Sequence, residues 1–360
     1  MSDSVRRHYE LYPYPNYPLL ASVRRFDTYA NNLAALWSRF NGELPPQNLK
    51  RILIAGCGSF APYPFSLANP DCAITALDLS GKSLARARLH CLLHGITTSR
   101  FLKGDLRDPS HAPGPFGFID AYGVLHHLDD PEAGLVSLSS RLGEGGILRV
   151  MVYSRYTRRE EESIRRALRI LKVEQPAEVL KMVARSKEGS RLKRFFEESD
   201  EVSFRCGLAD ALLHPLVTTY RIDRFMEMVS SSGLQPLLFA HAGALPEVEG
   251  EVARIRELER ERRSPGNFVL YLGRNVKGSG SAADATFVIN PCLSKALSPF
   301  RVAPLHIPGR LGHRIGPLDG AARSFLRRFR TPVPAAELSN EELEMANRYG
   351  DELFLLRYRG

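Results

Sequence analysis

The sequence has few of the features that mark secreted or membrane-bound proteins. Its five cysteines are an odd number, lie far apart and form no C-x-x-C pair, which argues against a secreted disulfide scaffold. No apolar run reaches the ~18 residues that a membrane span needs. The first residues, MSDSVRRHYELYPYP, lack the apolar core of a signal peptide. We therefore expect a soluble, cytoplasmic protein without a membrane partner.

The charge is biased toward one sign, with a formal net charge of +9, but the bias is not localised. Lys and Arg are spread along the whole chain and often alternate with Glu, as in RREEESIRRALR (158–169), which is typical of a solvated helix face. A nucleic-acid partner stays open but is not favoured. The 44% hydrophobic content excludes global disorder, and 360 residues suggest two domains or three.

Strands and helices alternate through most of the chain. The pattern predicts strands at 52–55, 73–77, 100–103, 118–124 and 147–153, with intervening helices that include one beginning at Ser80 and one at 131–142. The alternation returns with a helix at 221–232, strands at 234–240 and 267–272, and a charged helix at 251–263 between them. This order predicts an α/β fold, a Rossmann-like parallel sheet covered by helices on both faces.

The remaining segments suggest a domain plan. Residues 1–48 form an arm, extended and aromatic over 8–20 because of its prolines and helical over 22–41. The main domain covers 49–276, with a helical insertion at 156–217. A linker, 277–284, contains GSGSAAD. Residues 285–360 form a small accessory module whose strands (285–290, 301–307, 352–358) and helices (318–330, 340–349) suggest a winged-helix-like α+β arrangement.

A glycine turn and the acidic residue that follows the next strand indicate a cofactor-binding site. The predicted strand ILIA runs into Gly56-Cys57-Gly58, where glycines allow positive φ and close approach of a ligand to the backbone. Asp78 follows the next strand, twenty residues after Gly58, where a carboxylate can accept both ribose hydroxyls of an adenosine-containing cofactor. The G-x-G-x-x-A spacing also fits a dinucleotide, so NAD and S-adenosylmethionine both stay candidates on these residues alone.

Three later features, taken in order, make the sequence resemble the class I S-adenosylmethionine-dependent methyltransferases of bacteria. They are Gly104-Asp105-Leu106 after the third strand, FIDAYGVLHHL (118–128) around the fourth, and LGEGG (142–146) before the fifth. The resemblance implies that Gly56, Cys57 and Gly58 line the methionine part of the cofactor and that Asp78 binds ribose. It also implies that Asp105 binds the adenine amino group, that Leu79 and Leu106 sandwich the ring, and that Tyr122 and Gly123 lie beside the methyl group.

The resemblance supplies a reaction but no substrate. YELYPYPNYP (9–18) and LADALLHPLVTT (208–219) resemble bacterial methyltransferase domains whose methyl acceptors are poorly defined. Phe60 replaces a glycine that the family often has, and Pro62 and Pro64 crowd the first helix. The amine-methylating motif Asn/Asp-Pro-Pro-Tyr is replaced by Ala121-Tyr122-Gly123, which argues mildly against methylation of base amines and glutamine amides.

Fewer residues are candidates for binding or deprotonating the methyl acceptor than for binding the cofactor. His126 and His127 are possible general bases because the histidine pKa suits proton transfer, and Tyr122 completes the catalytic set. Tyr14 in the arm, and His214 and Tyr220 near the end of the insertion, are candidate substrate residues. His90, Cys91 and His94 share an exposed helix and make a poor zinc site, so we expect no metal.

The sequence therefore predicts in-line methyl transfer from S-adenosylmethionine to an O, N or C nucleophile of a small molecule, peptide or protein. Two alternatives stay open: a non-catalytic sensor that binds the cofactor and contacts a partner, and an NAD-dependent oxidoreductase. The oligomeric state cannot be derived from the sequence.

Overall fold

The computed structural model describes residues 3–279, 284–298 and 303–359. Its centre is a seven-stranded sheet with the order β3-β2-β1-β4-β5-β7-β6. The first five strands are parallel, and β7 runs antiparallel to both β5 and β6. The bounds are β1 Arg51–Ala55, β2 Ala73–Asp78, β3 Arg100–Lys103, β4 Phe116–Tyr122, β5 Leu142–Val152, β6 Gln235–Phe239 and β7 Phe268–Gly273. The prediction of a Rossmann-like parallel sheet is confirmed for the first five strands.

Helices cover both faces of this sheet because successive strand residues point to opposite sides. In β1, Ile52 and Ile54 join one hydrophobic core, while Leu53 and Ala55 join the other. The first core also takes apolar side chains from α2 and α3, and the second takes them from α5, α10 and α11. These helices and α4 have the bounds α2 Leu33–Asn41, α3 Pro62–Ala68, α4 Gly81–Leu93, α5 Pro131–Ser140, α10 Ile222–Ser231 and α11 Val248–Arg260.

Local signals fix several of the helix ends. The Ser80 side chain accepts a hydrogen bond from the Ser83 N–H and caps α4, as its position in the sequence predicts. Pro62 occupies the first turn of α3, where its missing N–H costs nothing, so the crowding by prolines is accommodated. The helix predicted at 22–41 is instead broken in two. Asn32 adopts an extended backbone and caps α2, which follows a 3₁₀ helix, Arg25–Asn31.

The arm is less extended than the sequence analysis expected. Residues Asp3–Leu11 form a helix, α1, so the prediction of an extended chain is wrong for residues 8–11. Val5 and His8 are buried on the inner face of α1, and this burial offsets the conformational entropy that the segment loses when it becomes ordered. The helix ends just before Tyr12-Pro13, where the proline disfavours helical backbone in the residue before it.

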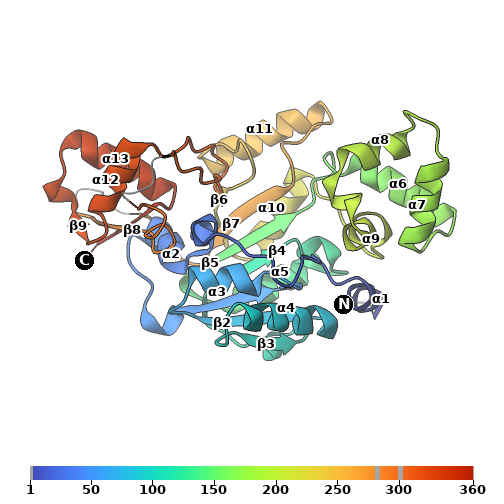
Figure 1. The fold of residues 1–360 in the computed structure, drawn as a ribbon, viewed down its shortest axis with the longest axis horizontal. Coiled ribbons are helices and arrows are strands. Elements are labelled where there is room, and N and C mark those ends of the chain that lie inside the picture. Colours follow the sequence, from blue (N-terminus) through green and yellow to red (C-terminus); the bar gives the residue numbers. More distant parts are fainter. Residues whose placement is uncertain (1–2, 280–283, 299–302, 360) are drawn as a thin grey trace.

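A group of helices follows β5 and carries a small hydrophobic core of its own, which includes Ile164, Val179, Phe195 and Leu208. The bounds are α6 Arg159–Ile170, α7 Pro176–Arg185, α8 Arg191–Glu198 and α9 Arg205–Leu213. Figure 1 shows this group on one side of the sheet, near α1, and the C-terminal residues on the opposite side, beside α2.

The C-terminal residues form a three-stranded sheet with the order β10-β8-β9 and two helices. The bounds are β8 Thr286–Ile289, α12 Gly320–Arg328, β9 Val333–Pro334, α13 Asn340–Asp351 and β10 Leu355–Tyr358. Ser339 and Glu342 form the predicted capping box. The strand predicted at 301–307 is wrong for the described residues 303–307, where Leu305 makes only an isolated bridge to Leu318. Pro304 and Pro308 offer no N–H to a ladder.

The observed element order is therefore strand, helix, strand, helix, strand, which differs from the β-β-α-α-β order of the winged-helix arrangement. The predicted linker overlaps residues 280–283, which lie outside the described residues. No helix in the described part of the chain is long and apolar enough to cross a bilayer.

Candidate functional site

The glycine turn after β1 is tied to the neighbouring strand. Gly56 and Gly58 have φ of +70° and +56°, a region that favours glycine. The N–H groups of Gly56 and Cys57 both donate to the Leu77 carbonyl, at 2.8 and 3.0 Å. A side chain at Gly56 would meet Val124, since its Cβ would lie 2.5 Å from that residue's methyl group. The turn is therefore held open at the carboxyl edge of the sheet, where ligands of such sheets bind.

Asp78 ends β2 and organises the same edge. One carboxylate oxygen accepts from the Gly58 N–H at 2.8 Å, and the other accepts from the Ser80 N–H at 2.8 Å. Burial raises the pKa of Asp78, and the backbone donors act against that rise. Each carboxylate oxygen keeps a second lone pair for a ligand hydroxyl. The geometry thus presents a fixed acceptor pair beside the glycine turn.

The N-terminal arm lies over this edge. The Tyr14 carbonyl accepts from the Ser59 N–H at 3.1 Å, and the Tyr9 carbonyl accepts from the Ser80 hydroxyl at 3.2 Å. Glu10 accepts from the Gly81 N–H at 2.6 Å. A Cβ at Gly58 would lie 2.5 Å from the Tyr14 carbonyl, so this glycine also permits the arm to dock. The arm therefore contacts the loops after both β1 and β2.

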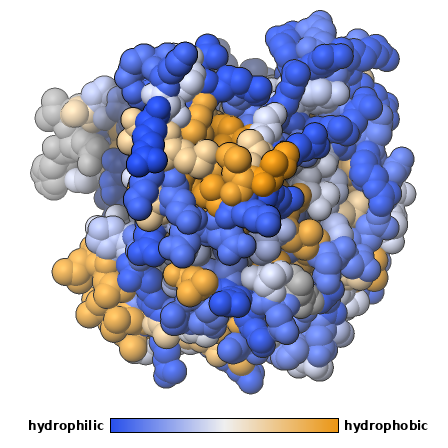
Figure 2. Space-filling model, turned by 90° about the vertical axis from the view of Figure 1, so that its right-hand side faces the viewer, coloured by the Kyte–Doolittle hydropathy of each residue, from blue (hydrophilic) through white to orange (hydrophobic). Residues whose placement is uncertain are grey.

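The arm and the sheet edge enclose a cavity of about 790 Å³. One end is lined by the glycine turn, Asp78, Leu79 and Leu106. The other end is lined by side chains from α1, from the segments that follow β4 and β5, and from the helical insertion, namely Tyr9, His127, Tyr153, Arg158, Asp200, Glu201, Phe204 and Asp210. Figure 2 looks onto the side of the molecule that carries the insertion, where the surface is mostly hydrophilic with a few apolar patches.

Asp210, in α9, is the most unusual group at the second end. The residue is 4% exposed, and its carboxylate accepts a hydrogen bond of 3.0 Å from the Tyr9 hydroxyl. Burial, followed by the nearby Glu201 charge, raises the pKa of Asp210 to about 7, while Tyr9, Arg158 and Arg165 act against that rise. This carboxyl group is therefore poised to exchange a proton near neutral pH.

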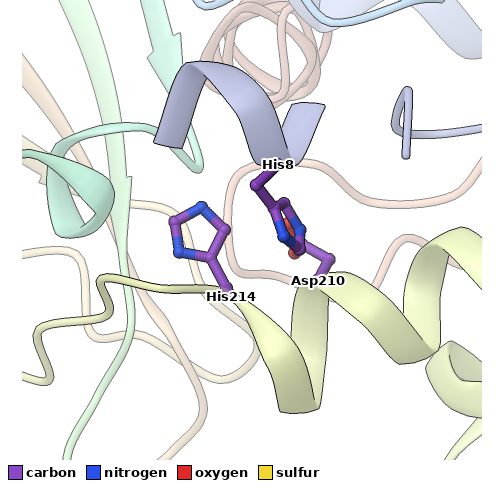
Figure 3. Close-up of side chains that lie close together, drawn as sticks. All are labelled: His8, Asp210 and His214. Atoms are coloured by element: carbon purple, nitrogen blue, oxygen red, sulfur yellow. The ribbon is translucent and has the colours of Figure 1, made fainter. Parts of the chain in front are cut away.

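Two histidines stand next to Asp210. Nitrogen atoms of His8 and His214 and an oxygen of Asp210 all lie within 4.8 Å of one another, with His8 on α1 and the other two residues on and just after α9 (Figure 3). Burial lowers the pKa of His8 to about 4 and that of His214 well below its ordinary value, so both rings are uncharged at neutral pH. Their Nε2 atoms are buried and have no hydrogen-bond partner among the described residues.

The tautomer of His214 argues against a metal in this cluster. Its Nδ1 accepts a hydrogen bond from the Leu216 N–H at 3.1 Å, so the proton of the neutral ring resides on Nε2. A nitrogen that carries a proton cannot ligate a cation.

Residues 53–148 match the methyltransferase domain family. The chain is also 31% identical over 252 residues to an uncharacterized protein of Synechococcus sp., an alignment that covers 67% of this chain and 60% of that protein. It is 31% identical over 98 residues to the ubiquinone biosynthesis O-methyltransferase of Xanthomonas euvesicatoria, covering 27% of this chain and 41% of that enzyme. The structure of PKMT2 from Rickettsia typhi in complex with AdoHcy shares the fold, with a TM-score of 0.56, 13% identity, and coverage of 96% of this chain and 77% of that one.

Residues 53–148 are a class I methyltransferase domain. The cofactor of this domain is S-adenosylmethionine. The chain spans only 60% and 41% of the length of the two curated relatives, so their whole-protein activities do not transfer to it.

The methyltransferase domain brings most of the predicted cofactor residues to one cavity. Gly56, Cys57, Gly58, Asp78, Leu79, Leu106 and Tyr122 all line it. Asp105 does not line it, although both of its neighbours, Gly104 and Leu106, do. The Asp105 carboxylate instead forms an ion pair of 2.8 Å with Arg107. Its role toward adenine stays a prediction.

The predicted catalytic histidines are both buried beside the cavity. His127 lines it and binds the Leu216 carbonyl through Nδ1 at 2.9 Å, whereas His126 lies behind it, stacked on Tyr153 at 3.7 Å. Burial lowers the pKa of His127 to about 3 and that of His126 well below its ordinary value. Both rings are therefore weak bases. Tyr122 is half exposed at the end of β4, 5.2 Å from the Arg149 guanidinium.

The three predicted substrate residues lie in different places relative to the cavity. Tyr14 lines the cavity. His214 lies behind the wall, in ring contact with His127 at 3.8 Å. Tyr220 is buried away from the cavity lining, and its hydroxyl has no partner among the described residues.

Sequence reasoning missed Asp210 and the Arg158–Glu201 pair. Asp210 lies within LADALLHP (208–215), the stretch whose resemblance to bacterial methyltransferases we noted without singling out its one carboxylate. Arg158 belongs to a run of charges that we interpreted as a solvated face, yet it packs over the Tyr153 ring at 3.9 Å and pairs with Glu201 at 2.8 Å. Only the tertiary structure brings these groups together.

Proposed function

We propose that this chain is an enzyme that transfers a methyl group from S-adenosylmethionine to an O, N or C nucleophile held at the Tyr9–Asp210 end of the cavity. One observation carries the proposal: a single cavity of about 790 Å³ joins the glycine turn and Asp78 to a second, differently lined end. A cofactor-binding sensor needs no such second compartment. The acceptor, a small molecule or an exposed peptide side chain, would enter that compartment.

The residues present fit the cofactor. The Asp78 carboxylate offers lone pairs to the ribose hydroxyls, and Leu79 and Leu106 offer apolar surfaces to the adenine ring. Gly56 and Gly58, both at positive φ, present backbone without a side chain to the methionine part. When bound, the cofactor supplies a methyl group activated by a sulfonium charge.

The protein's own task is positioning and proton removal. The arm closes the cavity over the loops after β1 and β2, which excludes water and holds the reactants together. Such positioning can lower the activation free energy by roughly 7–11 kcal/mol. Asp210 replaces the predicted histidines as the better general base, because its pKa of about 7 is closer to neutral pH than that of either ring. Tyr9 fixes the Asp210 carboxylate.

Calorimetry separates this proposal from the two alternatives. We expect S-adenosylmethionine and S-adenosylhomocysteine to bind at micromolar concentration and NAD not to bind. Incubation with methyl-labelled cofactor and fractionated cell extract should label an acceptor. Binding of NAD instead would point to an oxidoreductase, and cofactor binding without transfer to any fraction would point to a sensor. The cytoplasmic location predicted from the sequence stays a prediction.

A further inference from the structure

Asp210 has a feature that the proposed reaction does not by itself explain. It is a buried carboxylate that faces a cavity and, among the described residues, makes no direct ion pair. Among the described residues no Lys or Arg forms an ion pair with it, and its one hydrogen bond comes from the neutral Tyr9 hydroxyl. The two imidazoles nearest to it are uncharged at neutral pH. Buried carboxylates in folded proteins are nearly always paired, whereas Arg158 and Arg165 act on this one only through space, without a direct ion pair among the described residues.

The rest of this end of the cavity is also built for a cation. Five carboxylates and three guanidinium groups line the cavity as a whole. Asp120 is neutralised by Arg149 at 2.6 Å, and Arg158 is neutralised by Glu161 and Glu201. Setting aside Asp78 at the cofactor end, Asp200 and Asp210 remain at the acceptor end. Counting Arg310, the third guanidinium on the lining, acidic side chains still outnumber guanidinium groups by five to three, which favours cations over anions.

Aromatic rings complete the lining. Tyr9, Tyr14 and Phe204 line the same end of the cavity, whereas Tyr153 is already covered by the Arg158 guanidinium at 3.9 Å and by the stacked His126 ring at 3.7 Å. Aromatic faces attract ammonium groups by cation–π interaction. Carboxylates together with aromatic faces are what an ammonium group needs in order to leave water.

We propose that the methyl acceptor of this enzyme is a primary amine, which enters as an ammonium ion, pairs with Asp210 and loses a proton to it. This inference rests on the proposed function and narrows it from O, N or C acceptors to nitrogen. The acceptor nitrogen then forms a bond to the methyl carbon as the sulfur–methyl bond breaks, and the electron pair of that bond stays on sulfur. The products are a methylated ammonium ion and a thioether, with the released proton passing from Asp210 to solvent.

Binding of a matched pair of probes tests the proposal without requiring turnover. The full chain is saturated with S-adenosylhomocysteine and titrated by calorimetry with phenethylamine and with phenethyl alcohol, which differ in the ammonium group alone. We expect the amine to bind at least tenfold more tightly than the alcohol. Asp210→Asn should weaken amine binding at least tenfold and leave alcohol and S-adenosylhomocysteine binding unchanged. Asp223→Asn, an exposed acid on α10, is the matched control and should change nothing.

A second variant tests the role of Tyr9. The hydroxyl of Tyr9 lowers the pKa of Asp210, so Tyr9→Phe should move the pH dependence of amine binding upward without abolishing it. Glu201, Arg158, Arg165, His8 and His214 also face or act on Asp210 and are retained in this variant. Intact S-adenosylhomocysteine binding shows that the variant is folded.

Three results would overturn the inference. They are equal binding of amine and alcohol, unchanged amine binding in Asp210→Asn, and binding of Zn²⁺ or Mn²⁺ that depends on His8, Asp210 and His214, which would make the cluster a metal site. If S-adenosylhomocysteine itself does not bind the unmodified protein, the proposed function fails and not merely the choice of acceptor.

Discussion

At the scale of single residues, Asp78 holds the cofactor end of the site together. Replacing it with Ala removes the acceptor that the ribose hydroxyls need and frees the N–H groups of Gly58 and Ser80. A charged hydrogen bond contributes about 1.5–3 kcal/mol, so we expect S-adenosylhomocysteine affinity to fall roughly 10–100-fold. Calorimetry measures the loss, and Asp223→Ala serves as the control. Unchanged affinity in a folded Asp78→Ala protein would remove this residue from the site.

Asp210 should also leave a signature in stability. In the unfolded chain its pKa is near 3.8, whereas in the folded chain it is about 7. Between these values the native state holds a proton that the unfolded state has lost, so this group's contribution to stability falls as pH rises from about 4 to about 7. The side chain introduced by Asp210→Asn does not titrate, so the stability of this variant does not fall in that way. We therefore expect the free energy of unfolding of the variant to rise relative to that of the original protein across this window, with a difference of roughly 2–4 kcal/mol at pH 8.

Denaturant unfolding at pH 5 and pH 8 measures this difference in the cofactor-free protein. The exposed Asp223→Asn should show no such pH trend. A gain that shrinks as pH rises would contradict the assignment of a raised pKa to Asp210.

At the scale of elements, Glu251 joins α11 to the end of β6. It lies in the first turn of α11 and is fully buried, and it accepts hydrogen bonds from His241 Nε2 at 2.7 Å, from the Leu245 N–H and from Arg254. These donors lower the pKa of Glu251 to about 2 against the penalty of its burial. The group's contribution to stability is therefore complete above about pH 4.5 and is lost as pH falls toward 2.

We expect Glu251→Ala to lower the free energy of unfolding by about 3 kcal/mol or more, because it leaves buried donors unpaired. Urea unfolding at pH 7 measures the change. Glu257→Ala, on the same helix but exposed and paired only with Arg260, should stay within about 0.5 kcal/mol of the original. Equal effects of the two substitutions would show that the buried network contributes nothing to holding α11.

At the scale of the whole molecule, the C-terminal module shares a core with the sheet. Phe287, Phe329 and Phe354 belong to the same hydrophobic cluster as Trp37 of α2 and Ile52 of β1. The Asn290 side chain donates to the Tyr29 carbonyl at 3.1 Å, and the Phe354 ring meets the Tyr29 ring at 5.1 Å. The module is therefore packed against the N-terminal segment instead of hanging from a linker.

Trp37, the single tryptophan of the chain, reports on that shared core. Phe354→Ala should lower stability by about 3–5 kcal/mol, and Trp37 fluorescence and circular dichroism should shift together in one transition. Leu180→Ala, at an exposed position on α7, should shift neither by much. Two separate transitions, with Trp37 unaffected by the substitution, would mean that the module folds on its own.

The sequence by itself determined the sheet, the glycine turn and Asp78. Those features depend on residues close together in the chain: a two-residue side-chain period, a turn that requires positive φ, and a cap at Ser80. It did not determine the break of the 22–41 helix at Asn32 or the failure of 303–307 to pair, because both depend on which partner each segment meets.

The acceptor end was decided by tertiary structure alone. Tyr9 and Asp210 are 201 residues apart and acquire their chemistry only when α1 docks against α9. The desolvation that raises the pKa of Asp210 and lowers that of His127 is a property of the closed cavity, which no local pattern encodes. A short stretch of chain can fix backbone geometry and ligand-facing turns. The protonation state of a side chain depends on everything that surrounds it.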